Sequence, residues 1–240
     1  MATYVLVHGG WVGGWFWRRL APLLGAAGHE VLRPTLTGLG ERSHLSSPAI
    51  TLDTHARDVV NVLEFEDLRE VILVGHSYSG MVITAAAEAS AARVAQMVYL
   101  DAFVPRDGET LADLLGPDMT AAFVYLAESE GEGWRIPLPF PLEAFGFSRA
   151  DVAWMSPRMS DQPLRTMTEP VRLGGGNAER LPRTFIACNR GATGLFAESA
   201  RRARGAQWQF YDLDVPHGAA VTDPRAVADL LLSLTERRPV

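Results

Sequence analysis

A serine stands at the centre of a stretch that could carry nucleophilic chemistry. The run Val71-Ile-Leu-Val-Gly-His-Ser-Tyr-Ser-Gly80 begins with four branched apolar residues, which is typical of a strand buried on both faces. A helical segment rich in alanine follows directly and extends to about Ala92. A strand that turns sharply into a helix around a serine is a nucleophile elbow, and the helix N-terminus there favours developing negative charge. We therefore predict that Ser77 is the nucleophile of an acyl-transfer reaction.

The elbow departs from the strict G-x-S-x-G pattern at one position. Ser79 stands where the last glycine is expected, and Gly80 follows it directly. Serine is small enough for the tight turn, so we keep the interpretation. The alternative is an ordinary strand–loop–helix unit that carries a serine by chance.

A serine hydroxyl needs a base to remove its proton, and the base needs a third group that fixes its tautomer. In proteins with such an elbow the chain order is serine, acid, histidine. Of the six histidines, His217 alone lies after Ser77, so the order selects it as the base. The alternative is a surface histidine in the loop before the last helix.

The acid of the triad is predicted by elimination. The acid often follows the fifth strand, predicted at 183–188, where the sequence reads Cys188-Asn-Arg-Gly191 and contains no carboxylate. Asp212 and Asp214 are close to His217 in sequence, which hinders contact with the far side of its ring. Asp101 remains, near the end of an apolar strand, where a carboxylate needs a partner. The alternative is that Asp101 caps the following loop.

An oxyanion hole needs two backbone N–H groups that point at the developing charge. We predict that Tyr78, the residue after the nucleophile, provides one and that Gly10 provides the other. Gly10 lies in the glycine-rich turn His8–Gly14, which His8 is predicted to brace without reacting itself. The glycines of this turn do not form a G-x-G-x-x-G pattern, and no His, Cys and carboxylate cluster has metal spacing. We therefore expect no cofactor and no metal.

The elements that would position these residues alternate between strands and helices. Strands are predicted at about residues 3–7, 30–33, 71–74, 96–104, 183–188 and 206–211, and helices at about 15–27, 53–66, 79–92, 195–204 and 223–237. The helix at 53–66 is predicted to bury Val59, Val60, Leu63 and Phe65. The alternation predicts an α/β fold with a mainly parallel sheet of about six strands and helices on both faces. Ser77 and His217 follow predicted strands and Asp101 lies near the end of one, so the three should meet at the carboxyl edge of the sheet.

The region between Pro105 and Pro182 breaks this alternation with short apolar clusters and many prolines. It is too long for a simple connection, so we predict a lid at residues 105–182, inserted into a core domain of residues 1–104 and 183–240. The aromatic and methionine side chains of this region indicate a largely apolar pocket for an aromatic or polycyclic ester. The predicted substrate-binding residues are Trp11, Phe103, Trp134, Trp154, Met155 and Met159.

The composition narrows the function classes. The 240 residues are 48% hydrophobic, and the net charge of −6 without an extended basic run argues against nucleic acid or an anionic membrane as a partner. All 22 basic residues are arginine, which excludes lysine Schiff-base chemistry. The single cysteine, Cys188, excludes an intramolecular disulfide. With no secretory leader and no apolar run of 18 residues, we expect a cytoplasmic protein, a monomer or homodimer, acting on a small molecule.

The sequence resembles the α/β-hydrolase superfamily along its whole length. It is most similar to the small esterases related to plant methylsalicylate esterases and hydroxynitrile lyases. The shared stretches are Tyr4-Val-Leu-Val-His-Gly-Gly10, Gly13-Gly-Trp15, Ala27-Gly-His-Glu-Val31, Val71-Ile-Leu-Val-Gly-His-Ser-Tyr78 and His217 before its helix. Similar bacterial members also carry Thr35-Leu-Thr-Gly-Leu-Gly-Glu-Arg42 and Tyr99-Leu-Asp-Ala-Phe-Val-Pro105. The resemblance implies an inserted lid and places Asp101 at an alternative acid position of the superfamily.

The lyase branch differs at three positions. Its members use a lysine after the catalytic histidine, a threonine in the first turn and a glutamate before the serine, where this chain has Gly218, Gly9 and His76. The resemblance therefore implies a serine carboxylesterase that works through an acyl-enzyme, for instance on a methyl ester of secondary metabolism. The second hypothesis is a non-hydrolytic member that binds a small apolar ligand or catalyses a lyase or cyclase step.

Overall fold

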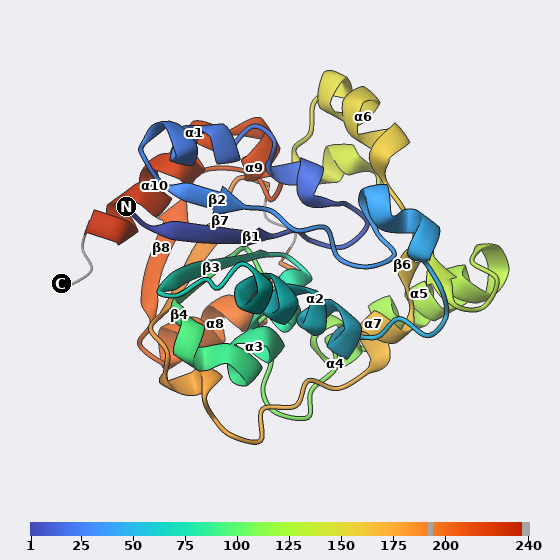
Figure 1. Cartoon of the computed structure of the whole chain (residues 1–240). Coiled ribbons are helices and arrows are strands. Elements are labelled where there is room, and N and C mark those ends of the chain that lie inside the picture. Colours follow the sequence, from blue (N-terminus) through green and yellow to red (C-terminus); the bar gives the residue numbers. More distant parts are fainter. Residues whose placement is uncertain (192–193, 237–240) are drawn as a thin grey trace.

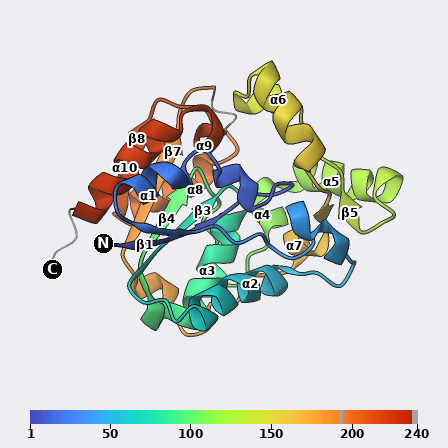
Figure 2. The ribbon, with the colours of Figure 1, turned by 45° about the horizontal axis from the view of Figure 1, so that its top comes forward.

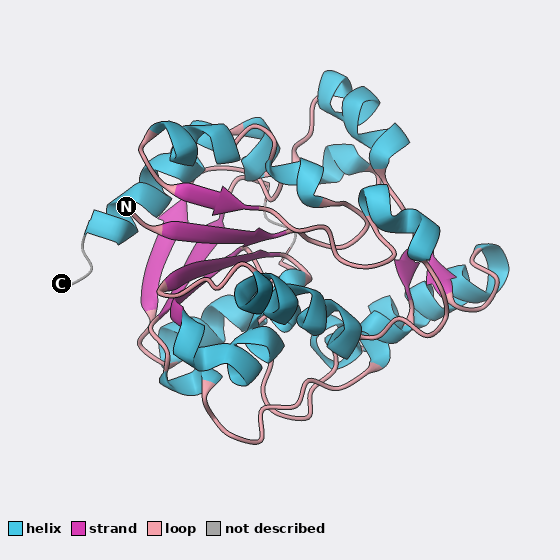
Figure 3. Ribbon diagram, in the orientation of Figure 1, coloured by secondary structure: helices cyan, strands magenta, loops and turns pink. Residues whose placement is uncertain are grey.

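A six-stranded sheet forms the centre of the molecule in this computed structural model, which describes residues 1–191 and 194–236. The strand order is β2-β1-β3-β4-β7-β8, and all neighbouring strands pair in parallel (Figure 3). The strands are β1 (Thr3–Val7), β2 (Glu30–Leu32), β3 (Val71–His76), β4 (Val94–Leu100), β7 (Arg183–Cys188) and β8 (Gln209–Leu213). Every residue of β3 is buried, as its run of branched side chains predicts. The predicted α/β class is confirmed.

Helices cover both faces of the sheet (Figure 1). One face packs against α1 (Ala21–Ala26), α9 (Ala219–Thr222) and α10 (Pro224–Glu236). The other face packs against α2 (Leu52–Phe65), α3 (Ser79–Ser90) and α8 (Ala197–Gly205). Each layer encloses its own apolar core, so the sheet is shielded from water on both sides. In the described part of the chain, no helix has the length and apolar character that crossing a bilayer requires.

Several predicted boundaries shift where the backbone turns. The helix predicted at 15–27 is split into a 3₁₀ turn (Gly14–Trp17) and α1, because Pro22 fits only the first turn of a helix. The strand predicted at 96–104 ends at Leu100, since Asp101 has a φ of +43° and leaves the sheet. The last strand begins at Gln209, after a turn in which Gln207 has a φ of +57°.

The prediction that Phe65 belongs to the buried face of its helix is wrong. Val59, Val60 and Leu63 are buried, but the Phe65 side chain is 86% exposed. Residues two positions apart in a helix point in nearly opposite directions, so Phe65 cannot share the face of Leu63. At the other end of the chain, Arg237 of the predicted last helix lies outside the described residues.

Residues 105–182 connect β4 to its neighbour β7, and their helices lie beyond the carboxyl ends of the strands (Figure 2). The chain then returns past the end of α3, where Glu88 accepts hydrogen bonds from the N–H groups of Gly175 and Ala178. They form α4 (Leu111–Leu115), α5 (Pro117–Glu130), α6 (Arg149–Met155), α7 (Arg165–Thr168) and a two-stranded antiparallel sheet of β5 (Arg135–Ile136) and β6 (Gln162–Pro163). Their buried side chains join the two cores of the main sheet. The division into a core domain and a lid stays a prediction.

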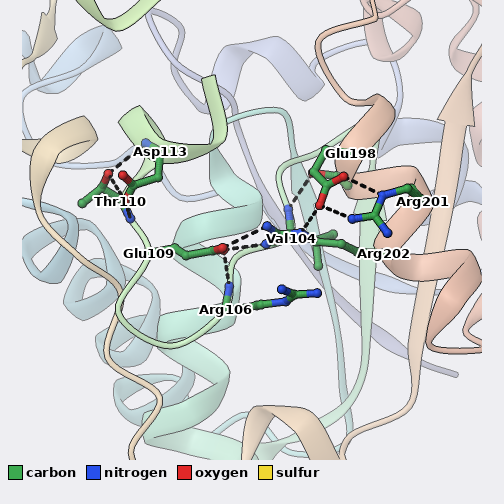
Figure 4. A network of polar contacts seen from close by, with 9 residues as sticks. Val104, Arg106, Glu109, Thr110, Asp113, Glu198, Arg201 and Arg202 are labelled. Carbon is green, nitrogen blue, oxygen red and sulfur yellow. Dashed lines mark hydrogen bonds and ion pairs between the residues drawn. The ribbon is translucent and has the colours of Figure 1, made fainter. Parts of the chain in front are cut away.

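The loop that follows β4 is fixed by α8 (Figure 4). Arg202 donates a hydrogen bond to the carbonyl of Val104 at 3.0 Å and pairs through its guanidinium with the carboxylates of Glu109 and Glu198. Ser199 accepts a hydrogen bond from the Val104 N–H at 3.0 Å. The half-buried guanidinium therefore holds the chain directly downstream of Asp101 in one place.

Candidate active site

Ser77 occupies the turn between β3 and α3 and has a φ of +56°, a strained value for a residue with a side chain. Its N–H donates to the carbonyl of Leu100 at 3.4 Å, and its own carbonyl accepts from the N–H groups of Phe103 and Gly80 at 3.1 Å. A Cβ on Gly80 would lie 1.9 Å from the carbonyl oxygen of Phe103, so only glycine fits there. The contacts to β4 and its loop hold the strained turn in place.

Ser79, which stands where the elbow pattern has its last glycine, makes specific contacts. The buried Ser79 hydroxyl accepts a hydrogen bond from the His76 N–H at 2.9 Å and donates to the carbonyl of Val7 at 2.7 Å. A glycine would leave both backbone groups without this partner. Ser79 thus joins the elbow to the end of β1, where the glycine-rich turn begins.

Asp101 and His217 are brought together from positions 116 residues apart. Asp101 Oδ2 lies 2.7 Å from His217 Nδ1, well inside hydrogen-bond range. The other carboxylate oxygen accepts from the Cys188 N–H at 3.4 Å, and the Asp101 N–H donates to the carbonyl of Ile186 at 2.8 Å. The Asp101 side chain is 10% exposed, so the imidazole is the partner that a buried charge needs.

The two alternative carboxylates bind elsewhere. Asp212 accepts hydrogen bonds from Asn189 and Arg204. Asp214 pairs with Arg190 at 3.6 Å and is largely exposed. Neither residue hydrogen-bonds His217 among the described residues.

Aromatic rings enclose the His217 imidazole. Phe196 stacks on it with a centroid separation of 4.8 Å and an interplanar angle of 13°, and Phe145 lies 5.3 Å away. The His76 ring lies 4.4 Å away and donates from Nε2 to the His217 carbonyl at 3.0 Å. Burial first, and then the neighbouring His217, hold the pKa of His76 well below its usual 6.5. A neutral His76 therefore supports the loop of His217.

Both predicted oxyanion donors, Gly10 and Tyr78, line one cavity together with Ser77 and His217. His8 Nδ1 donates to the carbonyl of Gly9 at 2.8 Å, and its Nε2 accepts from the Leu36 N–H at 3.0 Å. In a trans peptide the C=O and N–H point in opposite directions, so the Gly10 N–H points away from His8. Among the described residues, no protein atom accepts a hydrogen bond from the N–H of Gly10 or Tyr78.

The cavity has a volume of about 80 Å³ and is almost entirely apolar. Four predicted substrate-binding residues line it: Trp11, Phe103, Met155 and Met159. The lining also includes five of the aromatic and methionine side chains from which the apolar pocket was predicted, namely Phe123, Phe140, Phe145, Phe147 and Met167. The sequence did not indicate the remaining apolar lining residues, which are Val12, Phe16, Leu111, Leu115, Leu138, Leu142 and Leu195. The aromatic and methionine content of residues 105–182 predicts an apolar pocket, but no local pattern shows which of these side chains face the cavity.

The structure does not place Trp134 or Trp154 in this cavity. Trp154 packs edge-on against Trp15 and lies between the guanidinium groups of Arg19 and Arg158, each 5.3 Å from its ring. Trp134 packs against the guanidinium group of Arg135. Both indoles make cation–π contacts with arginine side chains, and their role in substrate binding stays a prediction.

Two positions that distinguish the lyase branch are tightly packed. A Cβ on Gly218 would lie 2.4 Å from the ring of Phe147. A Cβ on Gly9 would lie 3.1 Å from both His76 Nδ1 and Ser77 Cβ. Larger residues at either position would therefore disturb the rings and the nucleophile around the cavity.

Two buried histidines predict how stability depends on pH. Burial lowers the pKa of His8 and of His55 from 6.5 to about 4. At a pH between 4 and 6.5, these histidines bind more protons in the unfolded chain than in the folded protein. The free energy of unfolding therefore falls as the pH falls from 6.5 to 4. One such histidine contributes about 3 kcal/mol to this fall, at about 1.4 kcal/mol per pH unit.

His55→Gln should reduce that fall by about 3 kcal/mol, measured by urea unfolding across this pH range. The reference is the difference in unfolding free energy between wild type and variant above about pH 7.5. The side chains of His55 and of the glutamine that replaces it are both neutral there, so this difference reports the lost contacts to Thr37 and Tyr78. Parallel curves for variant and wild type down to pH 4 would contradict the prediction.

Comparisons with known proteins identify a family and similar folds. The model of the Alpha/beta hydrolase family matches residues 4–230. The carbendazim hydrolyzing esterase of Nocardioides sp. (strain SG-4G) is 39% identical over 241 residues, covering 98% of this chain and 100% of that protein. Salicylic acid-binding protein 2 of Nicotiana tabacum is 39% identical over 103 residues, covering 42% of this chain and 40% of the tobacco protein. A solved extracellular alpha/beta-hydrolase from a Paenibacillus species has a TM-score of 0.85 at 24% identity, covering 97% of this chain and 98% of its own.

Proposed function

Because this chain belongs to the alpha/beta hydrolase family and is a carboxylic ester hydrolase, we propose that Ser77, His217 and Asp101 form its catalytic triad. The observation that carries the proposal is the 2.7 Å hydrogen bond between His217 Nδ1 and Asp101 Oδ2. With its Nδ1 proton held by the carboxylate, the imidazole keeps Nε2 free to accept the proton of Ser77. We expect that Nε2 faces the serine.

The reaction proceeds through two tetrahedral intermediates. Ser77 Oγ attacks the ester carbonyl carbon while His217 Nε2 takes the hydroxyl proton, and the N–H groups of Gly10 and Tyr78 stabilise the oxyanion. The C–O bond to the alcohol then breaks, and the imidazolium returns its proton to the leaving oxygen. His217 next takes a proton from water, the hydroxide attacks the acyl-enzyme, and Ser77 leaves with the proton as the free acid departs.

The substrate is an uncharged ester with an aromatic or polycyclic group, and a methyl ester of secondary metabolism fits this description. Two features support this part of the proposal. The cavity lining carries aromatic, aliphatic and methionine side chains, and the titratable groups among the lining residues are His76, His217 and Tyr78. No arginine is among the lining residues, so a substrate carboxylate would be an unpaired buried charge there. Burial of such a charge costs several kcal/mol. The relative from Nocardioides also makes carbendazim a reasonable member of the substrate panel.

A matched pair of substrates tests the charge selectivity. Methyl 4-nitrobenzoate and monomethyl terephthalate have similar shapes, but only the second carries a carboxylate. After each kcat/KM is divided by the rate constant for hydroxide hydrolysis, we expect the anionic ester to react at least about 100-fold more slowly, as the desolvation of its charge requires. Equal normalised values would show that the pocket tolerates a charge, and the neutral-substrate proposal would then be abandoned.

Fluorophosphonate labelling separates the esterase from the non-hydrolytic alternative. A reactive serine attacks the probe phosphorus and displaces fluoride, so intact-protein mass spectrometry should show one phosphonyl group, located on Ser77. Ser77→Ala is the matched control and should take up none. A wild-type protein that stays unlabelled would favour a role in binding or lyase chemistry.

A further inference from the structure

Two peptide units flank Gly10, the residue that carries one proposed oxyanion donor. His8 holds the first unit through the Gly9 carbonyl. The second unit ends in the N–H of Trp11, which donates to Oε1 of Gln162 at 3.2 Å. Glycine has no Cβ and rotates freely, so the direction of the Gly10 N–H depends on the restraint of both neighbours. The second restraint comes from a residue 151 positions away in the chain.

Trp11 itself needs this support, because its φ of +61° is unfavourable for a bulky side chain. Three hydrogen bonds fix it. The backbone N–H donates to Gln162, the indole Nε1 donates to the carbonyl of Ile136 at 2.8 Å, and the Trp11 carbonyl accepts from the Ser160 N–H at 3.1 Å. Ile136 belongs to β5, Gln162 to β6, and Ser160 lies two residues before β6. The strained turn is therefore held by the small second sheet and its flanking chain.

Gln162 is itself held rigidly. Its side chain is completely buried, and Nε2 donates to the Thr166 hydroxyl at 2.7 Å, which in turn donates to the carbonyl of Pro163. The Thr166 side chain lies beside the hydroxyl of Tyr78, which also bonds His55 at 2.9 Å. Gln162 is therefore connected to the chain segments of both oxyanion donors, although it does not line the cavity.

We propose that Gln162 is a positioning residue that orients the Gly10–Trp11 peptide and thereby aims the Gly10 N–H at the oxyanion. The inference rests on the proposed esterase function and on Gly10 as an oxyanion donor. Its chemical basis is that Oε1 accepts from Trp11 while Nε2 anchors the amide to Thr166. The amide acts through the backbone and does not touch the substrate.

Gln162→Met tests this role, because methionine has nearly the same length but cannot accept the Trp11 N–H. Loss of an oxyanion donor costs about 10² to 10³ in kcat, and a misaimed donor should cost less. We therefore expect kcat for 4-nitrophenyl butyrate to fall by about 10- to 100-fold with KM changed by less than about twofold. The inhibition constant of phenylboronic acid, which forms a tetrahedral anion on the serine, should rise in parallel.

Gln96→Met is the matched control for a buried glutamine. Gln96 is 4% exposed and donates from Nε2 to the Thr184 hydroxyl at 2.9 Å, within the main sheet and not among the cavity-lining residues. Both variants lose a glutamine–threonine hydrogen bond, which should cost each of them about 1 kcal/mol in urea unfolding. Gln162→Met also loses the bond from the Trp11 N–H, so its loss of stability should be the larger of the two. Only Gln162→Met should lose kcat and phenylboronic acid affinity.

Gln162→Glu gives a second readout if the methionine variant folds poorly. A protonated carboxyl group imitates the amide, since its carbonyl oxygen accepts from Trp11 and its O–H donates to Thr166. The ionised form loses that donor and places negative charge beside the oxyanion hole. The kcat of each protein is calculated from the concentration of fluorophosphonate-reactive sites. The ratio of the Gln162→Glu value to the wild-type value should then rise as the pH is lowered from 8 to 6.

The two proposals fail in different ways. If Ser77→Ala hydrolyses 4-nitrophenyl butyrate as fast as wild type, the esterase mechanism fails and this inference falls with it. If Ser77→Ala is inactive while Gln162→Met keeps kcat within about twofold, Gln162 does not position the donor. Equal losses of kcat in Gln162→Met and Gln96→Met would also overturn the inference, because they would report general destabilisation.

Discussion

Ser77→Ala is expected to lower kcat for ester hydrolysis by about 10⁴ to 10⁶ while leaving the fold intact. The substitution removes the nucleophile but keeps the backbone contacts of the elbow to Leu100, Phe103 and Gly80. Alanine and serine are similarly strained at the positive φ of this turn, so the free energy of unfolding should stay within about 1 kcal/mol of wild type. Hydrolysis of 4-nitrophenyl butyrate measures the rate, and circular dichroism checks the fold.

His217→Ala belongs to the same experiment. Because the serine and the histidine act as one unit, this variant should lose a similar factor, and the double variant should lose little more. Multiplicative losses in the double variant would mean that the two residues contribute independently. A folded Ser77→Ala protein that keeps most of the wild-type rate would end the covalent mechanism.

Asp101→Asn is expected to lower kcat by about 10⁴ with little change in packing. The asparagine keeps an oxygen that can accept from the Cys188 N–H, but its amide N–H₂ then faces His217 Nδ1. That arrangement favours the imidazole tautomer with the proton on Nε2, which cannot accept the proton of Ser77. The loss should appear in kcat at neutral pH, measured with the same ester as above.

Asp212→Asn and Asp214→Asn are the matched controls. Both remove a carboxylate close to His217 in sequence, but their ion pairs with Arg204 and Arg190 are at the surface. Exposed pairs of this kind contribute about 0 to 1 kcal/mol, so both variants should keep nearly full activity. A large loss in either control, with Asp101→Asn active, would reassign the acid.

The elements that carry strong local patterns could be predicted from the sequence. The branched run of β3 and the small residues around Ser77 both report a local requirement, namely burial on two faces and a tight turn. The partnership of Asp101 and His217 was predicted by elimination and from a resemblance, because no local pattern records a contact across 116 residues. It stays a proposal as a catalytic assignment, although the distance agrees with it.

Other features had no signal that sequence reasoning could use. Gln162 is one polar residue among many until the fold brings it beside Trp11. The aromatic composition of residues 105–182 predicts apolar burial but does not distinguish the inside of the cavity from its outside. Trp134 and Trp154 were therefore expected in the pocket, whereas each packs against arginine side chains. The direction of a side chain in a short helix or in irregular chain depends on tertiary packing, which periodicity does not encode.

In evolutionary terms, the order of changes at Gly218 and Phe147 is constrained by their packing. Any side chain at position 218 overlaps the Phe147 ring, which is 7% exposed and forms part of the cavity wall. A lineage that acquired the lysine of the lyase branch would first have to lose this ring, and with it the existing shape of the pocket. That first step alters ester selectivity before any new chemistry is available. Replacement of the glycine is therefore coupled to the ring, and a side chain at position 218 requires a prior change at position 147.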